Sequence, residues 1–146
     1  MITHKKTTLV RIIAFLLIIV MVLPMTVSAT VQPRASAYLD NYNAYVYLPG
    51  NGEVRVYFNV QGTDDMDELG ALSVAIYESL DGTNWTWKKT FTHDSTAGML
   101  GHDDYLYGSY VSYNGVSGRY YKAYVCVWAG KDGDGDARYF WTSAKH

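Results

Sequence analysis

A hydrophobic alternation of two residues runs through most of this chain and is incompatible with a helical fold. Its clearest stretch alternates polar residues with the apolar Val54, Val56, Phe58 and Val60. Successive side chains of a strand point to opposite sides of a sheet, so this stretch predicts a strand with one buried and one exposed face. The rest of the chain after residue 40 has no convincing helical periodicity, and we predict an all-β protein.

Turn-forming residues separate the alternating segments. The expected strands span residues 41–48, 53–61, 71–79, 85–92, 108–113, 119–129 and 136–143. About seven short strands with regular turn signals are typical of a single antiparallel β-sandwich, which we place at residues 36–146.

The strand expected at 119–129 carries a further signature. Tyr121 stands near its start, and small apolar residues follow at every second position. This pattern resembles the tyrosine corner of immunoglobulin-like and fibronectin-like sandwiches. The resemblance implies that Tyr121 is buried and that its hydroxyl bonds to backbone a few residues upstream. The only cysteine, Cys126, is expected on the opposite face as an inert thiol.

Three segments resemble a second group of proteins. Residues 67–73, 85–94 and 118–130 are similar to a family of small secreted proteins of Gram-positive bacteria that carries a domain of unknown function. The resemblance implies export and supplies no catalytic residues.

The N-terminus reads as a targeting segment. Lys5, Lys6 and Arg11 precede an apolar run at 12–23, and small residues end at Ala29. This order predicts a signal peptide at 1–29, a flexible lead at 30–35 and a secreted, extracellular protein. An apolar run this short is well below the roughly 20 residues of a spanning helix. An uncleaved membrane anchor is the alternative.

The charge of the exported part limits its partners. Three of the 12 basic residues leave with the signal peptide and all 14 acidic residues stay, which gives a net charge of about −5. Nucleic acids and anionic lipid surfaces favour basic partners. We therefore expect no nucleic-acid partner and no membrane contact after signal removal. The sequence does not define an oligomeric state.

The acidic residues gather in three loops that strand order brings to one end of a sandwich. The candidate metal ligands among them are Asp64, Asp65, Asp67, Asp132, Asp134 and Asp136. Aspartates spaced by two in a tight loop suit calcium, the one candidate cofactor. Their mutual repulsion is expected to raise some of their pKa values. The alternative is a solvated hairpin turn.

Aromatic residues form the second candidate site. Tyr77, Tyr124 and Trp128 are expected on the outer face of two neighbouring strands, where they would form a ligand-binding platform. The alternative is that the 93–107 loop covers them. Trp85, Trp87 and Phe91 share one face of their strand and are expected in the core.

These features favour a secreted, non-enzymatic binding module for carbohydrate or a cell-surface polymer, acting through the aromatic face or the acidic loops. A secreted protein-interaction or bacteriocin-like factor is one alternative. A small hydrolase is another, although the chain carries no recognised nucleophile elbow or zinc motif.

Overall fold

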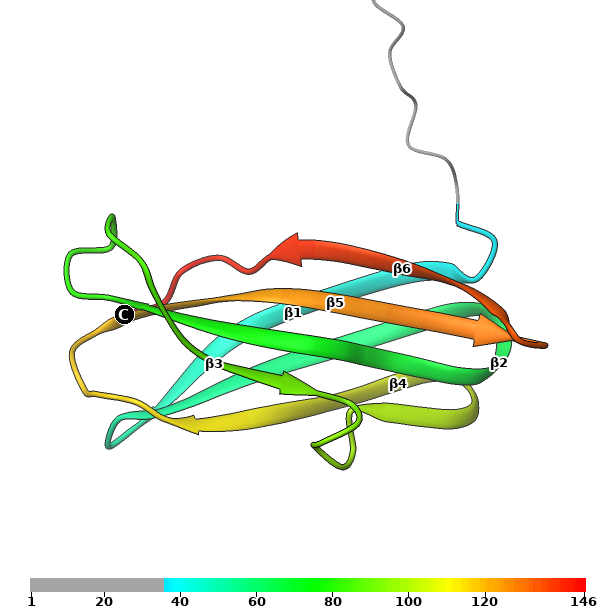
Figure 1. Cartoon of the computed structure of the whole chain (residues 1–146), viewed down its shortest axis with the longest axis horizontal. Helices are drawn as coiled ribbons and strands as arrows, with labels where there is room; N and C mark the ends of the chain where they lie inside the picture. The colour runs from blue at the N-terminus through cyan, green and yellow to red at the C-terminus, as the bar shows by residue number, and fades with distance from the viewer. Residues whose placement is uncertain (1–35) are drawn as a thin grey trace, which may run out of the picture. The chain divides into compact units, whose positions relative to one another are not determined.

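A computed structural model describes residues 36–146 of the chain, which form six antiparallel strands and no helix (Figure 1). The strands are β1 (Leu39–Gly50), β2 (Glu53–Ser79), β3 (Thr86–Thr92), β4 (Leu100–Asn114), β5 (Tyr120–Lys131) and β6 (Asp134–Trp141). The all-β prediction is confirmed. The described part contains no helix long and apolar enough to cross a membrane. The predicted signal peptide, 1–29, and the predicted lead, 30–35, lie outside the described residues.

Strand β2 organises the sheet, because its 27 residues pair with four other strands. Its first part lies between β1 and β4, where Tyr57 faces Tyr45 and Tyr110. Its second part lies between β5 and β3, where Ala75 faces Tyr124 and Thr90, and β6 joins the far side of β5. We call these the β1 half and the β5 half of the sheet. The sheet curls along β2, so that the two halves face one another (Figure 1).

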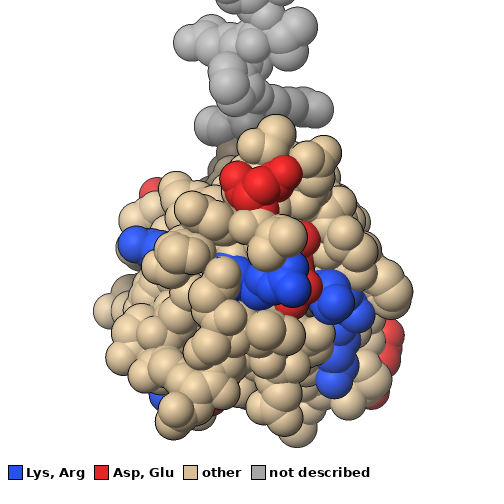
Figure 2. Space-filling model, turned by 90° about the vertical axis from the view of Figure 1, so that its left-hand side faces the viewer, with Lys and Arg blue, Asp and Glu red and all other residues tan. Residues whose placement is uncertain are grey.

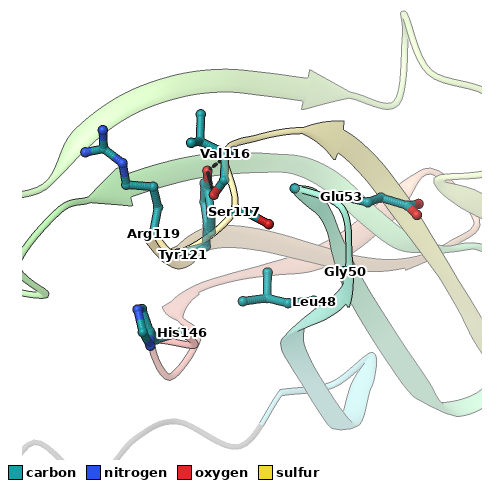
Figure 3. Close-up of a pocket in the computed structure, with 10 residues that line it drawn as sticks. Leu48, Gly50, Glu53, Val116, Ser117, Arg119, Tyr121 and His146 are labelled. Carbon is teal, nitrogen blue, oxygen red and sulfur yellow. Dashed lines mark hydrogen bonds between the residues drawn. The ribbon is translucent and has the colours of Figure 1, made fainter.

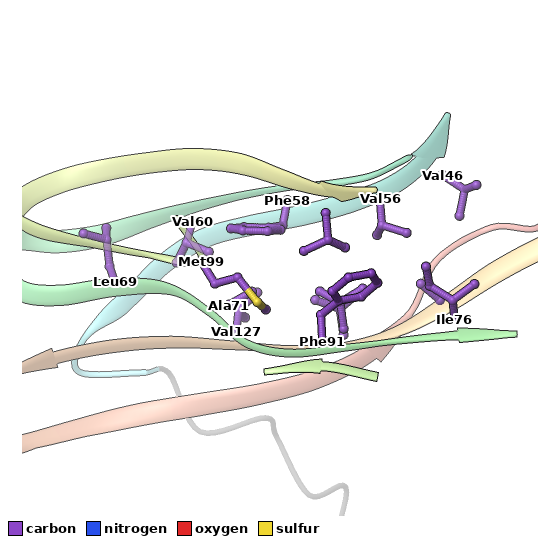
Figure 4. Close-up of a cluster of buried hydrophobic side chains, with 14 of the residues drawn as sticks. Val46, Val56, Phe58, Val60, Leu69, Ala71, Ile76, Phe91, Met99 and Val127 are labelled. Carbon is purple, nitrogen blue, oxygen red and sulfur yellow. The ribbon is translucent and has the colours of Figure 1, made fainter. Parts of the chain in front are cut away.

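The core consists of the apolar side chains of the alternating segments. Fully buried side chains from both halves fill the space inside the curl, as Figure 4 shows. They include Val54, Val56, Phe58 and Val60 from the β1 half, and Val74, Ile76, Ala123, Val125 and Val127 from the β5 half. Removing these surfaces from water is the main favourable contribution to folding, at roughly 25 cal/mol per Å² of apolar area.

The prediction for Tyr121 is confirmed. Only 1% of the residue is exposed, and its hydroxyl accepts a hydrogen bond of 2.7 Å from the backbone N–H of Val116, five residues upstream. The same hydroxyl donates to the carboxylate of Glu78 at 2.6 Å. Burial, followed by the bond to Glu78, raises the pKa of Tyr121 to about 12. The hydroxyl also fills the space that a side chain at Gly115 would need.

The number of strands differs from the seven expected, because the segments 53–61 and 71–79 are parts of one strand, β2. Met66 and residues 68–70, which lie between these segments, pair with an extended β4, where Glu68 faces His102 and Leu69 faces Gly101. Leu69 is fully buried, so this segment also contributes to the core. A polar stretch that reads as a loop in isolation therefore stays in the sheet.

The expectation that Trp87 is buried is wrong. Phe91 faces Val74 and is 7% exposed, whereas Trp87 faces Tyr77 and is 57% exposed. The ladder between β2 and β3 shifts register between these pairs. An extra residue on one strand reverses the direction of every side chain beyond it, so Phe91 points inward and Trp87 outward. Trp85, also expected in the core, is half-buried outside it.

Candidate functional site

The outer side of the β5 half carries an aromatic surface built from four segments of the chain. We call it the tryptophan face, and it consists of Tyr77, Trp85, Trp87, Lys122, Tyr124, Tyr139 and Trp141. These side chains come from β2, from β3 and the residue before it, from β5 and from β6. The strands place them because their alternate positions point inward to the core.

Trp141 joins the two tyrosines of the predicted platform. Its ring centre lies 5.0 Å from that of Tyr77 and 4.8 Å from that of Tyr124. Tyr124 also stacks on Tyr139, at 5.8 Å between ring centres. The structure therefore brings Tyr77 and Tyr124 together, as expected from the sequence, through a tryptophan on the last strand. Such tilted and edge-on contacts stabilise aromatic pairs and hold the rings in place.

Lys122 lies among these rings. Its ammonium group is 4.4 Å from the ring centre of Trp85 and 4.4 Å from that of Trp141. A cation at this distance is attracted to the electron-rich face of an indole. The ion pairs between residues 36 and 146 do not include Lys122. The positive charge is thus held by two aromatic rings rather than by a carboxylate.

Much of the tryptophan face is open to solvent. Tyr139 is 61% exposed and Trp141 is 48% exposed, and both were missed as site residues in the sequence analysis. The signal was present in the alternation of Tyr139, Phe140 and Trp141. Phe140 faces the buried Val125, which directs its two neighbours outward. The alternation alone does not show whether Phe140 or its two neighbours point outward, and the pairing of β6 with β5 decides this.

Trp128, the third residue of the predicted platform, lies elsewhere. It stands four positions after Tyr124 along β5, which is about 13 Å in an extended strand. Its ring lies against Gly130 and Gly135, which face each other across β5 and β6. The ring fills the space that a Cβ at either glycine would need. The indole borders an open hollow of about 480 Å³, lined also by Asp67, Glu68, His102, Lys131, Gly133 and Asp134.

Two of the predicted acidic loops converge beside this hollow. The Nζ of Lys131 lies 3.0 Å from a carboxylate oxygen of Asp64, and the backbone N–H of Asp132 donates to Asp67 at 2.7 Å. Asp134 instead accepts a bond of 3.2 Å from the hydroxyl of Tyr38, and Asp136 accepts one of 2.5 Å from Ser36. The side chain of Asp65 makes no ion pair with another residue of the described part.

The pKa values of Asp64 and Asp136 move opposite to the direction expected from repulsion. The hydrogen bond from Lys131 lowers the pKa of Asp64, and that from the Ser36 hydroxyl lowers the pKa of Asp136. No three His, Cys, Asp or Glu side chains among residues 36–146 are grouped so as to hold a metal ion. The calcium site remains a prediction that needs a binding measurement.

A second aromatic cluster, which the sequence analysis did not propose as a site, crosses the outer side of the β1 half. Tyr57 lies between Tyr45 and Tyr110, with ring centres 5.2 Å and 5.0 Å away. The guanidinium of Arg55 lies 5.3 Å from the ring centre of Tyr110. The rings of Tyr45 and Tyr57 are nearly parallel, so each covers a face of the other. Tyr45 and Tyr110 are 48% and 47% exposed, so this row is a second aromatic surface open to solvent.

A smaller pocket, of about 230 Å³, lies at the end of the domain where β1 turns into β2 (Figure 3). Leu48 and Val116 line it on two sides, and Arg119 and His146 lie at its edge. Its inner wall contains Tyr121, whose hydroxyl is already engaged in the bonds described above. We therefore assign the pocket to the packing of the turn against the 115–119 loop.

The single thiol fits the inert role expected for it. Cys126 is buried, and burial raises the pKa of its thiol, so the reactive thiolate is disfavoured.

Comparison of the chain with protein-family models, with curated proteins and with solved structures finds no match. The functional conclusion therefore depends on the surfaces described above.

Proposed function

We propose that this chain is a secreted, non-enzymatic binding module for carbohydrate or a cell-surface polymer, and that the tryptophan face is its binding surface. The observation that supports this most is the exposure of Trp141, Tyr139 and Trp87 on one side of the sheet. Proteins rarely leave large aromatic side chains together in solvent unless another molecule covers them.

The chemistry of the tryptophan face suits sugar rings. Indole and phenol rings are flat and apolar on their faces, which match the C–H faces of a sugar. The hydroxyls of Tyr77, Tyr124 and Tyr139 and the ammonium of Lys122 are hydrogen-bonding groups beside those rings. Contacts between the rings of Trp141, Tyr77 and Tyr124 hold them in one arrangement before a ligand arrives, which reduces the entropy lost on binding.

The finer fold assignment belongs to the same proposal. We interpret the curled sheet as an immunoglobulin-like or fibronectin-like β-sandwich, with the β1 half and the β5 half as its two layers. The buried Tyr121 and its bond to Val116 support this interpretation, since they reproduce a tyrosine corner. Export through the signal peptide at 1–29 is tested by the N-terminus of the protein in the culture medium, which should lie near Thr30. A product that retains Met1 would contradict export with cleavage.

A sedimentation assay tests the binding function. The purified protein is mixed with insoluble polysaccharides and with bacterial cell walls, and the bound fraction is measured after centrifugation. Trp141→Ala should weaken binding to the retained polymer at least tenfold, because it removes the ring that joins both tyrosines. Tyr105→Ala is the matched control, since Tyr105 is also an exposed aromatic residue but belongs to β4. Equal binding by wild type and Trp141→Ala would contradict the proposal.

A further inference from the structure

We infer that the tryptophan face selects an acidic polysaccharide, one whose sugar rings carry carboxylate groups, and that Lys122 binds those carboxylates. The inference rests on the proposed function and specifies its ligand. It starts from the position of a single charge within an otherwise uncharged aromatic surface. The other six members of the tryptophan face are tyrosines and tryptophans.

Lys122 lies between two indoles, whereas four of the seven other Lys and Arg residues between 36 and 146 have a carboxylate within 4.0 Å: Arg55, Lys88, Lys131 and Arg138. Lys89 also lies over an aromatic ring, that of Phe91, but over one ring only. The ion pairs of the described part leave Lys122 out, and two indoles hold its ammonium at 4.4 Å. An aromatic ring attracts the ammonium but does not neutralise it. A carboxylate brought by a ligand would form the missing charge-assisted hydrogen bond.

The surroundings of Lys122 favour a negative ligand. Lys122 is the third residue of β5, and other basic residues lie near the same end of the strands: Lys88 near the start of β3, Arg119 just before β5, and Lys145, which pairs with Tyr121. Figure 2 views this end, where Lys and Arg groups lie near the middle of the surface with Asp and Glu groups next to them. Of the acids at this end, Glu78 bonds to Tyr121 and Lys88, Asp81 bonds to the backbone of its own turn, and Glu53 pairs with Arg55.

The excess of acidic residues does not cancel this local charge. The acidic loops lie beyond the other end of β5, where Lys131 pairs with Asp64. Nine residues of extended strand separate Lys122 from Lys131, which is about 30 Å. Charges are largely screened beyond about 8 Å at physiological ionic strength. A polymer at the tryptophan face therefore meets the charge of Lys122 and its basic neighbours.

A uronic acid combines both groups that this surface recognises. Its ring can stack on the exposed indole of Trp141, and its carboxylate is attached directly to that ring. The ammonium of Lys122 lies over the ring of the same indole, 4.4 Å from its centre, so a sugar that packs on the part of Trp141 left exposed can place its carboxylate at Lys122. A neutral sugar makes only the first contact, which predicts weaker binding.

Two forms of one polymer test the inference in the full chain. Polygalacturonate carries a carboxylate on every sugar, and its methyl ester has the same backbone without the charge. We expect a Kd at least tenfold lower for polygalacturonate at low salt, and a loss of the difference at 1 M salt. Equal affinities for the two forms would overturn the inference. So would a protein that binds neutral polysaccharide and neither of these polymers, although the proposed function would then stand.

Substitutions assign the effect to Lys122. Lys122→Met keeps the apolar stem and should abolish the preference for polygalacturonate, so that this variant binds the polymer and its methyl ester with equal affinity. Lys122→Arg should retain most of the selectivity. Lys131→Met, at the acidic end, is the control and should not change it. Selectivity that survives Lys122→Met would contradict the inference, and so would polyglutamate binding as tightly as polygalacturonate, because the site would then recognise charge without the sugar.

Discussion

Removal of the hydroxyl of Tyr121 should destabilise the domain by more than one ordinary hydrogen bond. In Tyr121→Phe the backbone N–H of Val116 loses its acceptor at 2.7 Å, and the carboxylate of Glu78 loses its donor at 2.6 Å. A neutral bond contributes about 1 kcal/mol net and a bond to a charged group about 1.5–3 kcal/mol. Glu78 keeps Lys88 at 3.5 Å, which limits the loss. We therefore expect Tyr121→Phe to lower the free energy of unfolding by about 2–3 kcal/mol.

The assay is equilibrium denaturation by urea, supported by thermal melting. For a domain of this size the expected loss lowers the Tm by about 10 °C. Tyr105→Phe is the control, because Tyr105 is exposed. Loss of its hydroxyl should change the free energy of unfolding by less than about 0.5 kcal/mol. A change below about 0.5 kcal/mol for Tyr121→Phe would show that neither bond adds to the stability of the domain.

Three further predictions concern the core and the acidic groups. In urea denaturation, Phe91→Ala should lower the free energy of unfolding by about 3 kcal/mol and Trp87→Ala by less than about 1 kcal/mol, because only Phe91 is buried. Similar losses for the two variants would contradict the bulge in β3. Backbone bonds in its turn hold the pKa of Asp81 far below its ordinary 3.8, so the folded state binds fewer protons and stability is lost as the pH falls below about 4. Asp81→Asn should therefore make the acid part of the stability–pH curve shallower, and an unchanged curve would show that Asp81 does not contribute. The calcium hypothesis predicts that millimolar calcium raises the Tm, that Asp134→Asn reduces the rise and that Asp40→Asn does not; identical melting curves in calcium and EDTA would exclude it.

Local patterns were sufficient for the core strands of this fold. The alternation around Phe58 and the position of Tyr121 each predict a buried face, and both faces are buried in the structure. Hydrophobic burial depends on side-chain type and on the period of two, which the sequence contains directly. The same patterns gave the neighbouring positions of Tyr77 and Tyr124, because the strands that carry them pair.

The direction of Trp87 depends on the partner strand and could not be read locally. The register shift between β2 and β3 reverses its face relative to Phe91. Trp128 is a related case, because its place depends on Gly130 and Gly135 meeting across a hairpin. Such features follow from cross-strand register, which a single strand's sequence does not specify. They separate the predicted platform into the tryptophan face and the hollow beside the acidic loops.

Ligand binding on the tryptophan face can be observed through the four tryptophans of the chain. Each indole N–H gives its own signal in a two-dimensional NMR spectrum, and single Trp→Phe variants assign the four signals. Titration with a polysaccharide retained in the sedimentation assay should shift the signals of Trp85, Trp87 and Trp141. The signal of Trp128, which lies beside the acidic loops, should stay in place. Shifts confined to Trp128, or no shift of any indole at saturation, would contradict the account.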